Sequence, residues 1–189
     1  TVTTGSGTVG SANITNVSVS CTTNSFTIGG TVSGVSGTGL VLRNNGGNNL
    51  AIGANGAFTF GAPVLSGATY AVSVLTQPIN PSQTCTVTNG SGTVGSANVT
   101  NVAVSCITST FTIGGNISGL LDTGLVLLDN GTDALTISAI GAFTFAIPVA
   151  DGAGYSVTVK TQPSSIPAQF CGITGGAGTV AGANVTTVT

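Results

Sequence analysis

The chain of 189 residues carries only two basic and four acidic side chains and no histidine. Charged residues make up 3% of it, where a soluble domain averages about 25%, so the polar surface must come from Thr, Ser, Asn and Gly. Two isolated cations cannot neutralise a row of phosphates, which excludes a nucleic-acid partner. Because no run of about 18 apolar residues occurs, we expect no membrane span in this segment.

Short runs of Val, Thr and Ile alternate with polar residues and are interrupted every few positions by Gly, Asn or Ser. This pattern is typical of strands separated by turns. Within one repeat it predicts seven strands, at Phe26–Ser33, Gly39–Asn44, Leu50–Gly53, Ala57–Gly61, Tyr70–Gln77, Thr84–Thr88 and Val99–Cys106. Seven short strands at this spacing predict an all-β fold, an antiparallel β-sandwich.

The same alternation predicts the core, because every second side chain of a strand points to one face of the sheet. The residues expected there are aromatic or branched, and they recur in both halves of the chain: Phe58, Phe60, Tyr70, Val72, Val74, Val102 and Val104, then Phe143, Phe145, Tyr155, Val157 and Val159. We assign the aromatic residues to the core and not to a ligand site.

The sequence repeats with a period of 85 residues. Gly5–Asn13 recurs without change at Gly90–Asn98, and one residue is inserted later, so that Cys85 matches Cys171. A period of this length suits an independently folding domain better than a solenoid rung. We therefore expect tandem domains: residues 1–21 as the closing strands of a preceding repeat or a donated strand segment, 22–106 as a β-sandwich repeat, and 107–189 as a β-sandwich repeat that lacks the end of its last strand.

Two neighbouring motifs resemble a known family. Asn55–Phe60 has the pattern N-G-x-F-x-F, and Gly67–Val74 follows with G-x-x-Y-x-V-x-V. Together they resemble the prealbumin-like or carboxypeptidase-regulatory-like sandwich domains of bacterial surface proteins, over about half of each repeat. The resemblance implies an Ig-like sandwich that serves as a spacer or stalk module in a secreted or surface protein.

The four cysteines, without histidine or a close C-x-x-C pair, predict disulfides and an extracellular, secreted location. If Gly95 and Ser96 form a two-residue hairpin turn, the numbers of facing residues add up to 191, as those of Cys85 and Cys106 do. The same register gives Cys21 and Cys171 partners outside the 189 residues. The alternative pairs Cys21 with Cys85 and Cys106 with Cys171, and strand geometry favours the first scheme.

Candidate sites for chemistry are weak. Asp129–Asp133 resembles a calcium loop, but its counterpart Asn44–Asn48 has no carboxylate, and a hairpin turn explains both. Lys160 could form an isopeptide bond, yet its counterpart is Leu75, so we expect a solvated side chain. No base is present to activate a serine or threonine, and all four carboxylates fall in the second repeat: Asp122, Asp129, Asp133 and Asp151. We therefore expect no enzyme activity, no metal and no cofactor.

These observations favour a structural protein. Low net charge gives little repulsion between copies, so many like surfaces can associate. The sequence predicts a non-enzymatic repeat of an extracellular filament or surface stalk, whose partners are adjacent repeats or subunits of itself. The alternative is an adhesin segment whose Thr- and Asn-rich loops contact carbohydrate or another cell surface.

Overall fold

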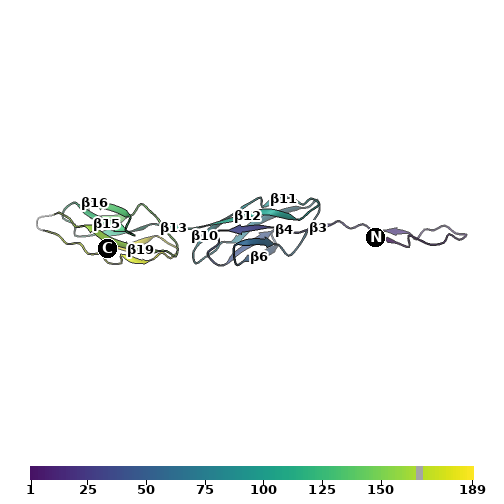
Figure 1. Cartoon of the computed structure of the whole chain (residues 1–189), viewed down its shortest axis with the longest axis horizontal. Helices are drawn as coiled ribbons and strands as arrows, with labels where there is room; N and C mark the ends of the chain where they lie inside the picture. Colours follow the sequence, from purple (N-terminus) through teal and green to yellow (C-terminus); the bar gives the residue numbers. More distant parts are fainter. Residues whose placement is uncertain (165–167) are drawn as a thin grey trace.

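The computed structural model describes residues 1–164 and 168–189, which form an all-β structure with several sheets. Figure 1 shows three parts in a row along the longest axis. The first is a two-stranded hairpin of residues 1–21, which we call the N-terminal segment, with strands β1 (Val2–Thr3) and β2 (Ser18–Val19). It stands apart from the two larger parts, which we call the first unit (22–106) and the second unit (107–189).

The first unit consists mainly of two four-stranded sheets, in the orders β10–β12–β4–β7 and β11–β9–β5–β6, and β3 pairs with β8. All seven predicted segments contain strands, but the predicted strand Phe26–Ser33 is divided between β3 and β4, and β8 and β11 are additional. The bounds are β3 (Ser25–Phe26), β4 (Ile28–Ser33), β5 (Leu40–Asn44), β6 (Asn48–Ile52), β7 (Gly56–Thr59), β8 (Val64–Leu65), β9 (Thr69–Thr76), β10 (Gln83–Thr88), β11 (Ser91–Thr93) and β12 (Val99–Thr108).

The pairing of β12 departs from the expected antiparallel arrangement. On one side β12 pairs antiparallel with β10, and the facing residue numbers add up to 191, as predicted. On its other side β12 pairs parallel with β4. Parallel neighbours need a crossover; here the chain between β4 and β12 passes through both sheets, so no hairpin links the two strands.

The predicted tight turn at Gly95 and Ser96 is also wrong. After β10 the chain leaves that sheet, and β11 pairs with β9 in the other sheet. Val94 is then buried in the core, and its backbone exchanges hydrogen bonds with Gly67 and Ala68. The register of β10 and β12 is therefore fixed by the sheets that both strands join, and not by a two-residue turn.

The core lies between the two sheets, and the prediction of its residues largely holds. Phe58 and Phe60 are buried and meet edge to face, with ring centroids 5.8 Å apart. Tyr70, Val72, Val102 and Val104 are also buried, whereas Val74 only packs against the core. In the second unit Phe143, Phe145 and Val157 are buried, whereas Tyr155 and Val159 are only partly buried.

The second unit repeats this plan with one difference. Its sheets have the orders β17–β14–β21 and β16–β15–β19–β20, and β13 pairs with β18. The first of these sheets has three strands, because no assigned strand among the described residues takes the place of β10. The bounds are β13 (Thr110–Phe111), β14 (Ile113–Ile117), β15 (Leu125–Asp129), β16 (Asp133–Ile137), β17 (Gly141–Thr144), β18 (Val149–Ala150), β19 (Gly154–Thr161), β20 (Ala177–Thr179) and β21 (Val185–Val188).

One glycine in each unit permits the parallel pairing. A Cβ atom on Gly30 of β4 would lie 1.7 Å from the carbonyl oxygen of Val102. The same holds for Gly115 of β14 and the carbonyl oxygen of Val188. No side chain fits such a contact, so the backbones of these strands approach each other only where the residue is glycine.

Replacing Gly30 with alanine should therefore destabilise the first unit by about 3 kcal/mol, because the methyl group forces β4 and β12 apart. Urea unfolding monitored by circular dichroism measures the loss. Gly53→Ala is the matched control, because its Cβ would meet nothing within 4 Å. Equal stability of the two variants would contradict the role of the close strand approach.

Candidate functional site

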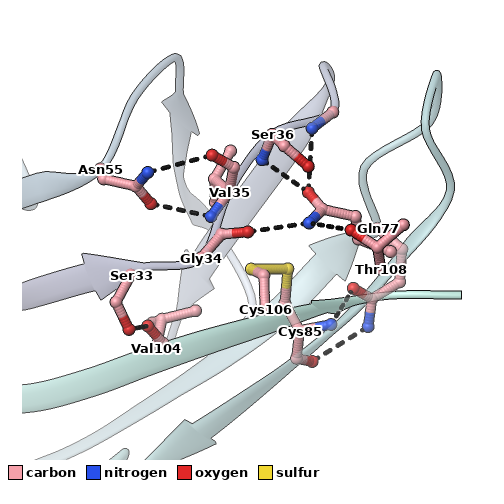
Figure 2. Close-up of a disulfide and its surroundings, with 12 residues drawn as sticks. Ser33, Gly34, Val35, Ser36, Asn55, Gln77, Cys85, Val104, Cys106 and Thr108 are labelled. Carbon is pink, nitrogen blue, oxygen red and sulfur yellow. Dashed lines mark hydrogen bonds between the residues drawn. A yellow bond between two sulfur atoms is a disulfide. The ribbon is translucent and has the colours of Figure 1, made fainter. Parts of the chain in front are cut away.

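The disulfide of the first unit joins the outer strand β10 to its neighbour β12 in one sheet. Cys85 of β10 faces Cys106 of β12, their Cα atoms are 3.9 Å apart, and their sulfurs are bonded. Figure 2 shows the bond below the loop that carries Gly34, Val35 and Ser36. The predicted pairing is confirmed, and it rules out the alternative in which Cys85 bonds Cys21.

In each unit a glutamine side chain binds the backbone of one cysteine, Cys85 in the first unit and its counterpart Cys171 in the second. The amide oxygen of Gln77 accepts the Cys85 N–H at 2.7 Å, and its amide nitrogen donates to the Cys85 carbonyl at 3.1 Å (Figure 2). Gln162 makes the same two bonds to Cys171, at 2.8 Å and 3.1 Å. Sequence reasoning missed this clamp, although the triplet Thr-Gln-Pro recurs in both repeats at this position.

Gln83 ties the loop above the disulfide to the sheet. Its side chain is buried, and its amide oxygen accepts the N–H groups of Ser36 and Gly37, each at 2.9 Å. Its amide nitrogen donates to the Gly34 carbonyl and to the Thr108 hydroxyl. A buried amide with all these bonds fixes its surroundings, since leaving any of them unmade is costly.

The other two cysteines are free within the part of the chain that the structure describes. Cys21 is exposed, and Cys171 is partly buried. Partners outside the 189 residues remain a prediction for both.

A second site lies where the two units meet. Asp151 belongs to the second unit, and its Oδ2 accepts the N–H of Ser82 in the first unit at 2.5 Å. Its Oδ1 accepts the N–H of Gly182 at 2.7 Å. Two backbone bonds complete the contact, from Ser109 to the Ser82 carbonyl and from Asp151 to the Ser109 carbonyl, each at 2.9 Å. We call this set the joint.

The carboxylate of Asp151 makes the joint specific. The Ser82 N–H, and then the Gly182 N–H, lower the pKa of this carboxyl below its ordinary value of 3.8, because both donate to the charged form. In the first unit the counterpart is Ser66, whose hydroxyl donates to the Gly95 carbonyl within its own unit. With two acceptor oxygens in place of a hydroxyl, Asp151 keeps a contact within its own unit, to Gly182, and adds one to Ser82 of the first unit. Sequence analysis considered Asp151 only for catalysis.

The remaining carboxylates also accept backbone N–H groups. Asp122 accepts from Thr123 at 2.7 Å, Asp129 from Ser156 at 3.1 Å, and Asp133 from Ile147 at 2.7 Å. These bonds give the carboxylates structural roles in loops and at strand ends.

The suspected calcium loop has the geometry of a hairpin turn. Asn130 and Gly131 have positive φ, as do Asn45 and Gly46 in the first unit, which fits a type I′ turn. Within residues 1–164 and 168–189 no group of three metal-ligating side chains is found. Lys160 is exposed on β19.

No family model matches the chain, and no match is found among the curated proteins. Across the described residues, no helix has the length and apolar character that crossing a membrane requires.

Removing the disulfide should lower the stability of the first unit. We expect Cys85→Ser with Cys106→Ser to cost about 3 kcal/mol, because the bond closes a loop with a sequence separation of 21 residues and so restricts the unfolded chain. Urea unfolding measures it in a background where Cys21 and Cys171 are both serine. That background alone should change stability by less than about 0.5 kcal/mol. If the change of Cys21 and Cys171 to serine alone lowered stability by as much, the stabilising role assigned to the Cys85–Cys106 bond would be contradicted.

Changing Asp151 to serine should loosen the joint without unfolding either unit. Small-angle X-ray scattering should then show a broader distribution of distances between the units, whereas Asp122→Ser, which alters a loop carboxylate that accepts the N–H of its neighbour, should leave the distribution unchanged.

The joint should also depend on pH. Because the pKa of Asp151 is lowered in the folded protein, the contribution of this carboxylate to the joint is complete above about pH 4 and is lost as the pH falls through the folded value. A joint that loosens between pH 5 and 8 would contradict this account.

Proposed function

We propose that the chain is a non-enzymatic structural segment of an extracellular filament or surface stalk. Its units would be tandem Ig-like, prealbumin-like β-sandwiches whose frame is the seven predicted strands, with the one parallel pair described above. The N-terminal segment would be the closing part of a further sandwich. Partners of the array would be adjacent repeats or subunits of the same kind.

The joint is the observation that carries this proposal. A flexible linker between domains leaves their relative orientation free, which is the usual expectation for beads on a chain. Here two hydrogen bonds cross the boundary, from the Ser82 N–H to Asp151 and from the Ser109 N–H to the Ser82 carbonyl. Two more, within the second unit, hold Asp151 in place. An array of units held at fixed angles stays extended and resists bending, as a stalk must.

Three further features support the proposal. Each of the four carboxylates accepts at least one backbone N–H, which supports a structural role for it. The Cys85–Cys106 disulfide is compatible with an oxidising, extracellular compartment. A 3% share of charged residues leaves a neutral surface that allows copies to pack side by side.

Two measurements test this proposal against the adhesin alternative: the shape of the particle, by scattering and microscopy, and its binding to a glycan array. We expect the chain with Cys21 and Cys171 changed to serine to be an elongated particle, with both units in line at one preferred angle. We expect no binding on a glycan array. Units that tumble independently, together with selective retention of a glycan class, would contradict the stalk and favour an adhesin.

A further inference from the structure

We propose that the N-terminal segment of one copy of this chain closes the second unit of another copy. In this arrangement residues 1–21 replace residues 172–189, and Cys21 of the first copy forms a disulfide with Cys171 of the second. Copies would thus be joined head to tail. This goes beyond the proposed function, because a single chain with a rigid joint could serve as a stalk segment whether or not copies exchange strands.

The N-terminal segment exposes side chains that its counterpart buries. Val9, Val17 and Val19 are 75%, 52% and 68% exposed, and at the matching positions Val94, Val102 and Val104 are each 1% exposed. Single exposed apolar residues are ordinary, but three that match three core positions form a face made for burial. An isolated two-stranded hairpin of this kind is only marginally stable in water.

The first unit shows what would cover this face. Residues 1–21 are identical to residues 86–106 at 18 of 21 positions. The pairing of Val2 with Val19 reproduces that of Val87 with Val104, so the segment already has the register found in the sheet. The face therefore fits the space beside β4 and β9 of a unit of the same repeat, where residues 86–106 lie in the first unit.

The second unit is the acceptor that this chain offers. In the first unit the outer strand β10 faces β12 at six residue pairs. At the same position in the second unit, the chain makes two backbone hydrogen bonds, both between Thr174 and Thr189, at 2.6 Å and 3.0 Å. In the N-terminal segment, residues 14–23 match β12 by the repeat, so they would supply a strand of the β12 type beside β14.

The two free cysteines are complementary halves of one bond. By the repeat, Cys21 corresponds to Cys106 and Cys171 corresponds to Cys85. Gln162 already holds the backbone of Cys171 as Gln77 holds that of Cys85. Oxidised glutathione can serve as the oxidant: the two thiols lose two protons and two electrons, their sulfurs bond, and one glutathione disulfide becomes two glutathione thiols.

The exchanged junction would also preserve the direction of the array. Cys21 is followed by the first unit just as Cys106 is followed by the second unit. A copy attached through Cys21 would therefore continue the row of units seen in Figure 1. Exchange that joins unlike surfaces in this way produces open chains and not closed dimers.

Refolding of the full chain tests the proposal. The reduced chain is refolded from urea at rising concentration with reduced and oxidised glutathione, quenched with alkylating reagent and run on a non-reducing gel. We expect a ladder of multiples that increases with concentration, and mass spectrometry should identify the Cys21–Cys171 peptide. Either Cys21→Ser or Cys171→Ser should abolish the ladder. Monomer alone, or mainly Cys21–Cys21 and Cys171–Cys171 pairs, would overturn the proposal.

A second pair of variants separates strand exchange from random oxidation. Val17→Asp with Val19→Asp should reduce the ladder at least tenfold, because a charge cannot enter the core position. Thr15→Asp is the matched control, since its counterpart Thr100 is exposed, and it should leave the ladder intact. A ladder unaffected by the two valine changes would contradict strand exchange. Failure here would leave the stalk proposal standing, because that is tested on the serine background.

Discussion

The structure of each unit depends on the burial of its closing segment. In the first unit Val94, Val102 and Val104 enter the core from residues that come last in the repeat, and β12 lies between β4 and β10. Burial of a valine side chain contributes about 1.5 kcal/mol or more, so these three contribute a large part of the 5–15 kcal/mol by which a typical domain is stable. The parallel contact at Gly30 and the disulfide at Cys106 hold the same strand from its two sides.

Several features follow from the sequence because they depend on local periodicity. The alternation of apolar and polar residues predicted which phenylalanines lie in the core. The 85-residue repeat predicted where equivalent strands begin in the two units. The pairing of Cys85 with Cys106 was predicted in the correct register, but from a turn that does not exist. The prediction held because Val87 and Val104 have to face the same core, which sets the same register that a tight turn would have set.

Other features could not be predicted, because they depend on which distant groups meet. Val94 lies in a stretch that looks like a turn, and its burial requires knowing that β9 offers a free edge to β11. The exchange of Ser66 for Asp151 is visible in the sequence, but its meaning depends on Ser82, which lies 69 residues away. Gln77 and Gln162 are conspicuous only once the cysteines they hold have been placed.

The central claim is that the closing segment is an integral part of a unit and that residues 1–21, which match the closing segment 86–106 in sequence, are stable only when a unit covers them. Native-state hydrogen exchange of the serine-background monomer tests it most directly. The account predicts that the amides of Val102 and Val104 exchange as slowly as those of β4, through global unfolding, whereas Val17 and Val19 exchange close to the rate of an unfolded chain. Fast exchange at Val102 and Val104, or strong protection at Val17 and Val19 in the monomer, would contradict it.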